Sequence, residues 1–261
     1  DGLGSQLRGT LAYPNALSQG AVNSDSLIHA LAVEVGRQLK LIGVHMNLAP
    51  VSNLAGIQEA GYRFDVYGED GFLVTSKLTS YLHGLQSQNI LGCAKYFPVQ
   101  GITVTDVIKG VPVTRPFIDS VQAYPFKELF RQGIHAVMPA TSEFPVFYET
   151  KKFARKNKFS SALLSSLFAG DWIKKRMDYK GLLIVDMRTV EAASGRIKGA
   201  DAEFLAFQAG NDIIITDNNP LPAIRRIRKL ARNDKRYADQ LQTSVKKILG
   251  AKYDAGLSVR K

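Results

Sequence analysis

Charged side chains lie at or just beyond the ends of short apolar segments in this chain. Asp186 closes the segment 182–186, Lys95 lies near the end of the segment 90–97, and Glu143 follows a third segment. A carboxylate in such a place can act as a nucleophile or as a proton donor, and an ammonium can hold a polar ligand. These residue types predict carboxylate chemistry at the end of a sheet.

The apolar segments are the elements that must position these side chains. Five of them are predicted to be strands: Val44–Val51, Ile90–Phe97, Ala136–Ala140, Leu182–Asp186 and Asp212–Thr216. Helical patterns precede them, and the four-residue spacing from Leu27 to Leu39 after Asn23-Ser24-Asp25 is one example. The first four strands begin roughly 45 residues apart, which predicts a parallel α/β sheet, as a (β/α) barrel or a doubly wound sheet. We expect one domain over residues 1–261.

Composition narrows the possible functions. The chain has 261 residues, of which 45% are hydrophobic and 22% are charged, as in an ordinary globular domain. It has no apolar run of about 18 residues, so no transmembrane segment is expected. The single cysteine, Cys93, is predicted to be buried. We expect no cofactor and no metal, because nucleotide-binding loops and Cys/His clusters are absent.

The net charge of +11 calls for an explanation. Basic residues gather between Lys151 and Lys158, between Lys174 and Arg176, and between Arg225 and Arg236. These clusters are either solvated surface or a surface for an anionic partner, such as a membrane or an acidic protein. Nucleic acid is not an expected partner, because no nucleic-acid-binding motif accompanies the charge.

Eight short motifs follow one another in a fixed order. They are Asp1-Gly2 with Leu7-Arg8, Met46–Val51, Tyr67–Asp70, Cys93–Pro98, Tyr124–Phe126, Gly181–Asp186, Ala209–Asp212 and Lys247–Leu257. In this order they resemble the N-terminal barrel of glycoside hydrolase family 3, in particular Bacteroidetes-type bacterial β-N-acetylglucosaminidases. The resemblance implies a TIM-type (β/α) barrel. The family has a further strand, helix and strand before Asp1, so we expect this chain to be part of a longer protein.

The resemblance also implies roles for individual residues. Asp186 matches the nucleophile, which attacks the anomeric carbon of the sugar. Lys95 matches a lysine that holds sugar hydroxyls, and Tyr96 replaces a histidine beside it. The expected substrate-binding residues are Asp1, Arg8, Arg63, Lys95 and Tyr96.

The chain departs from the family where a proton must be transferred. The subfamily uses a histidine that is oriented by an aspartate, and here the corresponding triplet is Asp106-Val107-Ile108. The aspartate is kept, but isoleucine transfers no proton, and general acid–base catalysis is typically worth about 10²–10⁴ in rate. Further polar positions of the family are replaced by Leu3, Asp65, Asn53 and Thr141. The four histidines, His29, His45, His83 and His135, are predicted to lie in helices or at the amino ends of strands.

Two functions are therefore expected. The first is a degenerate, catalytically inactive glycosidase domain, retained as a scaffold or glycan-binding module in a periplasmic or cell-envelope assembly. Its partners would be a glycan or peptidoglycan fragment, and a protein bound through the basic surface. The alternative is an active retaining exo-β-N-acetylglucosaminidase or β-glycosidase, with Asp186 as the nucleophile and Glu143 as the acid.

Overall fold

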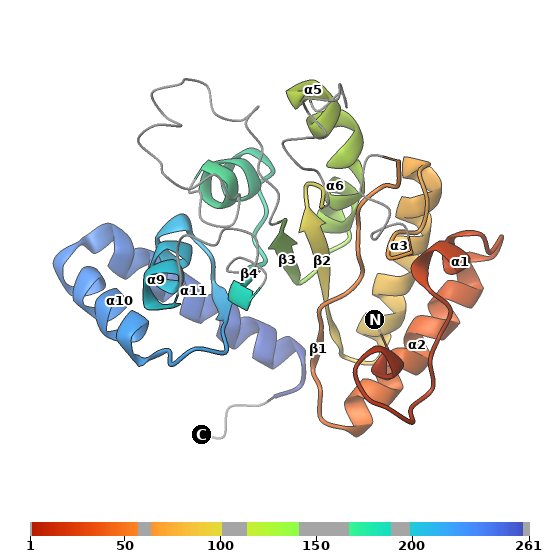
Figure 1. Cartoon of the computed structure of the whole chain (residues 1–261), viewed down its shortest axis with the longest axis horizontal. Helices are drawn as coiled ribbons and strands as arrows, with labels where there is room; N and C mark the ends of the chain where they lie inside the picture. Colours follow the sequence, from red (N-terminus) through yellow and green to blue (C-terminus); the bar gives the residue numbers. More distant parts are fainter. Residues whose placement is uncertain (1, 57–63, 101–113, 141–166, 189–198, 258–261) are drawn as a thin grey trace. The chain divides into compact units, whose positions relative to one another are not determined.

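The structure is a computed structural model that describes residues 2–56, 64–100, 114–140, 167–188 and 199–257. Its chain divides into two compact units, one of Asp1–Val137 with Ala251–Lys261 and one of Met138–Gly250. In both units strands and helices follow each other along the chain (Figure 1). The single domain expected from the sequence stays a prediction.

The first unit is built on two parallel strands. Strand β1 (Met46–Asn47) pairs with β2 (Leu91–Phe97), and Met46 lies opposite Leu91. A single further bridge joins Val51 to Lys95. The observed strand is shorter than the predicted strand 44–51. The ladder is interrupted because Pro50 has no backbone N–H group to donate. Strand β3 (Ala136–Pro139) lies where this unit ends.

Three longer helices cover these strands. Helices α3 (Gly71–Ser87) and α6 (Tyr124–Arg131) pack against β2, and α2 (Asp25–Leu41) packs against α3. The shorter elements are η1 (Leu3–Ser5), α1 (Ala16–Gly20), α5 (Arg115–Phe117) and η3 (Ile118–Gln122). The helical pattern from Leu27 to Leu39 is confirmed as α2, and Val35 and Leu39 are buried, but the first residue of the pattern is not. Leu27 is 61% exposed, whereas Ile28 is 2% exposed.

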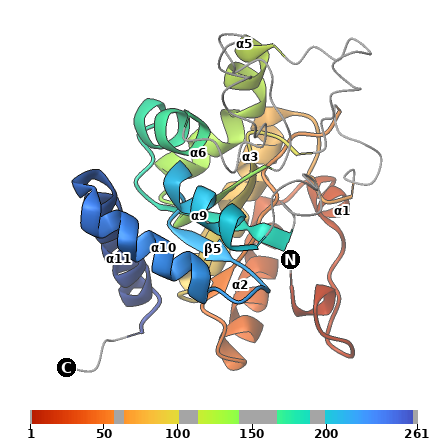
Figure 2. The ribbon, with the colours of Figure 1, turned by 60° about the vertical axis from the view of Figure 1, so that its left-hand side comes forward.

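The second unit also has two parallel strands. Strand β4 (Leu182–Asp186) pairs with β5 (Ile213–Ile215), and Asp186 lies opposite Ile215. The helices are η6 (Leu167–Arg176), α9 (Gly199–Ala209), α10 (Leu221–Asn233) and α11 (Lys235–Asp254), the last of which ends in the first unit. Helix α9 packs against β5 and η6, and α10 packs against α9 (Figure 2).

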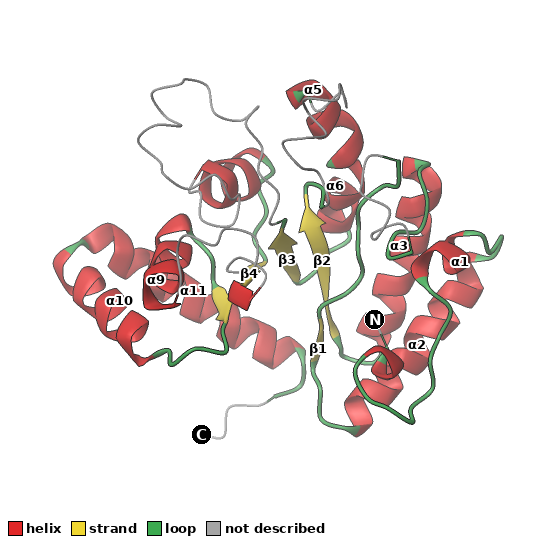
Figure 3. Ribbon diagram, in the orientation of Figure 1, coloured by secondary structure: helices red, strands yellow, loops and turns green. Residues whose placement is uncertain are grey.

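The order of strands and helices agrees with the sequence-based prediction (Figure 3). The strands at all five predicted positions exist, and the pairs β1–β2 and β4–β5 are parallel. Strand β4 is buried along its whole length and β2 everywhere except at Tyr96, as expected for strands covered on both faces. Of the helices in the described ranges, none is long and apolar enough to cross a membrane.

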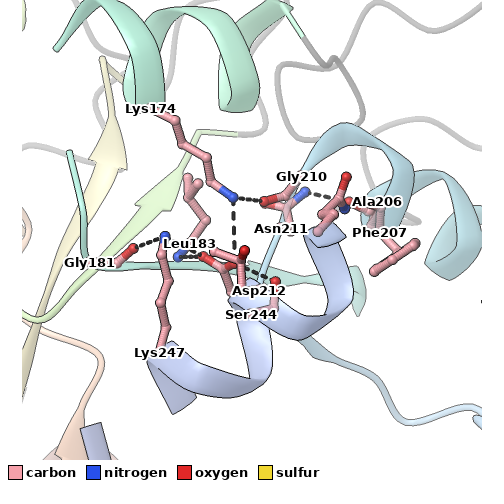
Figure 4. A network of polar contacts seen from close by, with 12 residues as sticks. Lys174, Gly181, Leu183, Ala206, Phe207, Gly210, Asn211, Asp212, Ser244 and Lys247 are labelled. Carbon is pink, nitrogen blue, oxygen red and sulfur yellow. Dashed lines mark hydrogen bonds and ion pairs between the residues drawn. The ribbon is translucent and has the colours of Figure 1, made fainter. Parts of the chain in front are cut away.

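A buried carboxylate connects the elements of the second unit (Figure 4). Asp212, whose side chain is 0% exposed, accepts hydrogen bonds from the Leu183 N–H at 2.9 Å and from the Ser244 hydroxyl at 2.6 Å. The ammonium groups of Lys174 and Lys247 each lie 3.4 Å from it. Burial lowers the pKa of Lys174, and the charge of Asp212 opposes this shift. One side chain thus joins β4, η6, β5 and α11.

These two lysines also bind backbone carbonyls. Lys247 donates to the Gly181 oxygen at 2.8 Å, and Lys174 donates to the Gly210 oxygen. Gly210 has a φ of +106°, in the region where glycine is favoured, and it follows the last residue of α9. The network therefore includes the turn in which α9 stops and β5 begins.

The close contact of α2 with α3 predicts a penalty for a larger residue at Gly84. A Cβ atom there would lie 2.6 Å from the Ala32 Cβ and 2.6 Å from the His29 carbonyl oxygen. We expect Gly84→Ala to lower the free energy of unfolding by about 1–3 kcal/mol, measured by urea unfolding followed by circular dichroism. Gly250→Ala is the matched control, because nothing lies within 4 Å of its Cβ, and it should stabilise by up to about 1 kcal/mol. Equal effects of the two changes would contradict the packing described.

The Asp212 network predicts a large cost for removing its charge. Asp212→Asn leaves two partly buried ammonium groups without a counter-ion, and we expect it to lower the free energy of unfolding by about 2–4 kcal/mol. Asp171→Asn is the control, because Asp171 pairs with Lys175 on an exposed helix surface at 2.7 Å and should contribute less than about 0.5 kcal/mol. Urea unfolding of both variants measures the difference, and similar losses would mean that the network is not a stabilising element.

Candidate functional site

The C-terminal end of β2 carries a buried ammonium. Lys95 is 8% exposed, and its N–H donates to the Pro50 oxygen at 3.0 Å. Its Nζ atom lies 5.6 Å from the centre of the Tyr96 ring. A lysine side chain has three N–H donors and no acceptor, so it suits a ligand rich in hydroxyl oxygens. Both predicted residues of this strand therefore lie side by side in the first unit.

Asn53 shapes the loop that follows β2. It is 1% exposed, and its Nδ2 donates to the carbonyl oxygens of Tyr96 at 2.9 Å and Pro98 at 3.2 Å. Its Oδ1 accepts from the N–H groups of Tyr96 at 3.4 Å and Gln100 at 3.3 Å. An ionised aspartate has no donor, so it cannot make the first two of these bonds. Asn53, where the family resemblance implies an aspartate, thus holds this loop in place through hydrogen bonds to its backbone.

A hollow of about 260 Å³ opens in the first unit. Its polar lining includes Tyr13, Asn15, Gln19, Asp65 and Tyr67. The Tyr67 hydroxyl lies 3.2 Å from the Gln19 Oε1 atom, and burial raises the pKa of Tyr67 well above its ordinary value. Phenols and amides both donate and accept hydrogen bonds, and the Asp65 carboxylate accepts them, so this lining suits a polar ligand with hydroxyl groups.

The second unit holds Asp186, the residue predicted to be the nucleophile. Asp186, at the end of β4, is 8% exposed, whereas the side chain of Arg188 is 58% exposed. The Arg188 Nη2 atom lies 2.6 Å from Oδ2 of Asp186, and Nε lies 2.9 Å from Oδ1. The Arg188 backbone N–H also donates to Oδ1, at 3.0 Å. The guanidinium therefore occupies both carboxylate oxygens.

This pairing changes what Asp186 can do chemically. Charge-assisted, bidentate bonds to arginine are roughly twice as strong as neutral hydrogen bonds, and here they raise the pKa of Arg188. Each carboxylate oxygen has about two lone-pair sites, so the arginine fork leaves Asp186 a lone pair for attack on carbon but lowers its nucleophilicity. Arg188 was not predicted from the sequence, although its place two residues after the strand-end aspartate was visible there.

The predicted site residues fall into three groups. Lys95 and Tyr96 lie in the first unit and Asp186 in the second, each at a strand end as expected. Arg8 is exposed in the turn after η1, where no described residue is shown to bind it. The other predicted positions lie outside the described residues: Asp1, Arg63, Asp106, Ile108, Thr141 and Glu143.

Sequence reasoning missed several residues that shape the site. Tyr13, Gln19 and Tyr67 line the hollow of the first unit, and only Tyr67 belongs to a motif that was noted. These three residues come together only because the fold brings the segment before α2 next to the loop before α3. No local sequence pattern predicts that contact. Val99, in the loop after β2, is fully buried.

The histidines lie where the sequence places them. His29 and His83 are in α2 and α3, and His45 and His135 precede β1 and β3, at the amino ends of these strands. Burial lowers the pKa of His135. Cys93 is buried as predicted, and burial raises its pKa to about 12, so it is no nucleophile at neutral pH. Among the residues that the structure describes, no three His, Cys, Asp or Glu side chains gather as a metal site.

Comparison with known sequences supplies the family. The model of the Glycosyl hydrolase family 3 N terminal domain matches residues 1–251. A β-hexosaminidase of Neisseria gonorrhoeae is 24% identical over 206 residues, which cover 78% of this chain and 54% of that protein. The chain spans about half the length of the curated β-hexosaminidases that it matches.

Solved structures are similar over almost the whole chain. A family 3 β-N-acetylglucosaminidase from Paenibacillus gives a TM-score of 0.78 at 20% identity, covering 98% of this chain and 48% of that one. The β-N-acetylglucosaminidase from Thermotoga maritima gives 0.75 at 19% identity, covering 98% and 53%. This likeness shows the fold, which is TIM-barrel-like, and so decides between the two architectures that the sequence left open. By the match of its family model over residues 1–251, the chain belongs to glycosyl hydrolase family 3, as an N-terminal domain.

Proposed function

We propose that this domain is a degenerate family 3 glycosidase, which no longer hydrolyses glycosides and serves as a scaffold or glycan-binding module in a periplasmic or cell-envelope assembly. The observation that carries this proposal is the occupation of both Asp186 oxygens by Arg188. The nucleophile position is filled by the chain itself. A second support is Ile108, which stands where the subfamily has its proton-transferring histidine.

These two features act on the same chemical step. Formation of a glycosyl-enzyme intermediate needs a free carboxylate and, for an ordinary leaving group, a proton donor. The ion pair weakens the first, and loss of the histidine removes about 10²–10⁴ in rate from the second. Both the attack of the carboxylate and the departure of the leaving group are thus expected to be slow in this chain.

Glycan binding draws support from other groups. Lys95 is a buried donor at the end of β2, and the hollow of the first unit is lined by tyrosines and amides. Sugars are recognised by such neutral and cationic donors around their hydroxyls. Since several curated relatives are β-hexosaminidases, we propose an N-acetylated hexosamine, such as a peptidoglycan fragment, as the bound sugar.

The second candidate is an active retaining exo-β-N-acetylglucosaminidase or β-glycosidase. It is favoured by the retention of Asp186 at the strand end and by the 58% exposure of the Arg188 side chain, which leaves it room to swing away. It needs an acid whose carboxyl lies about 5–5.5 Å from that of Asp186, and Glu143 is the proposed one.

Turnover of an ordinary aryl substrate separates the two candidates. We expect para-nitrophenyl N-acetyl-β-glucosaminide to be hydrolysed no faster by the wild type than by Asp186→Asn, since the nitrophenolate leaves slowly without a proton donor. Release of the coloured phenolate over hours measures this rate. Measurable turnover that Asp186→Asn abolishes would establish the active enzyme instead, and loss in Glu143→Gln as well would name the acid.

A better leaving group tests the ion pair alone. The dinitrophenyl glycoside needs no proton, because the Asp186 oxygen bonds to the anomeric carbon while dinitrophenolate departs with the electron pair. We expect Arg188→Ala to release dinitrophenolate about 10–100-fold faster than the wild type, as expected for removal of about 1.5–3 kcal/mol of charge-assisted bonding. Mass spectrometry should then find a sugar adduct on Asp186.

Two controls accompany this experiment. Arg188→Lys keeps the cation but loses the two-pronged geometry, so its rate should lie between those of the wild type and Arg188→Ala. The double variant Arg188→Ala, Asp186→Asn should return to background. Equal rates for wild type and Arg188→Ala would mean that the ion pair does not restrain the nucleophile.

A further inference from the structure

Helix α10 carries a row of cations on one face. Arg225, Arg228, Lys229 and Arg232 follow the spacing i, i+3, i+4 and i+7, which places them side by side on a helix, and all four are exposed. Together with Asn233 they line a hollow of about 400 Å³. Residues 221–233 contain no acidic residue.

Two neighbouring arginines form ion pairs, but these four cations do not. Arg226 pairs with Asp201 and lies 4.5 Å from the centre of the Phe204 ring, and Arg236 pairs with Asp234. Within the described part of the chain, none of the four cations of the row forms an ion pair. Like charges spaced four residues apart destabilise a helix, so an anion bound across the row relieves this repulsion.

A second hollow, of about 560 Å³, lies beside the row and shares Arg228 and Arg232 with it. Its apolar lining is Ala231, Ala238, Leu241 and Val245, from α10 and α11. Both helices are in view in Figure 2. On the α11 side the charges of Lys246 and Asp239 cancel. Cationic charge is therefore concentrated on the α10 side and apolar surface on the other.

Large apolar side chains extend this surface into solvent. They are Leu221 at 53% exposed, Ile224 at 45%, Val245 at 45% and Leu249 at 48%. Val245 and Leu249 lie four residues apart in α11, on one side of the helix, and the structure leaves both about half exposed.

We propose that the α10–α11 surface binds an anionic phospholipid bilayer. The lipid phosphates lie over the four cations, and the exposed apolar side chains contact the boundary between headgroups and acyl chains. Basic helices that also expose apolar residues bind bilayers in this way, with each Lys or Arg near the surface contributing. A nucleic acid or an acidic polymer would use the cations alone. This inference does not involve Asp186 and is independent of the proposed function.

Vesicle sedimentation of the full chain tests the charge. We expect it to sediment with vesicles of two parts phosphatidylcholine and one part phosphatidylglycerol at low salt, and not with pure phosphatidylcholine. Arg228→Gln, Arg232→Gln should weaken this binding roughly 30-fold. The control Lys40→Gln, Lys180→Gln removes the same charge from exposed lysines outside α10 and α11 and should bind as the wild type does. Equal losses in both variants, or no sedimentation of the wild type, would overturn the proposal.

A second pair of measurements distinguishes a bilayer from other polyanions. Val245→Ser, Leu249→Ser should weaken binding to the same vesicles roughly 10-fold, since two half-exposed apolar side chains lose their contact with lipid. Its binding to duplex DNA and to poly-glutamate should stay unchanged. If the serine variant binds vesicles like the wild type, or if the wild type binds either soluble polymer as tightly as the vesicles, the partner is a polyanion and not a lipid surface. Thermal unfolding checks that each variant is folded.

Discussion

The second unit depends on the burial of the Asp212 carboxylate. A charge that is fully removed from water is stable only where cations and hydrogen-bond donors surround it, and Asp212 has two ammonium groups, a hydroxyl and a backbone N–H around it. These partners come from elements far apart in the sequence, so the carboxylate fixes their relative positions. Strand β4 is one of these elements, and the place where it ends decides where Asp186 stands.

The same requirement explains the hydrogen bonds of two residues, Asn53 and Asp186, at positions that the family resemblance assigns to the site. Polar groups at the ends of buried strands need partners, which in an active glycosidase a sugar and water supply. In this chain Asn53 forms hydrogen bonds with the backbone of the loop after β2, and Asp186 accepts hydrogen bonds from the Arg188 side chain. Both arrangements satisfy the polar groups internally. Neither group therefore needs a bound sugar to satisfy its hydrogen-bonding atoms.

The net charge of +11 can be interpreted only when the ion pairs of the basic residues are known. Some basic residues, such as Lys174 and Lys247, serve the core of the second unit, and others, such as Arg37 and Arg131, pair with neighbouring glutamates. The row on α10 is a group of four neighbouring cations for which no ion pair forms within the described part of the chain. Composition left solvated surface and an anionic partner both open, and the distribution of ion pairs shows which basic residues the proposed surface would use.

The sequence by itself determined the order of strands and helices, the parallel pairing, the burial of Cys93 and the family. These properties follow from the local period of the apolar residues, from the spacing of the segments and from the order of short motifs. All three can be read without knowing which segments contact each other in the fold. The tertiary structure decided that Arg188 closes on Asp186, that Asn53 brackets a loop over 40 residues away, and that Val245 stays exposed. The last two depend on which surfaces meet across the fold, because Asn53 bonds residues more than 40 positions away and a side chain is covered only where another element reaches it. The Arg188–Asp186 pair is local, but the residue types alone do not say that the two side chains turn toward each other.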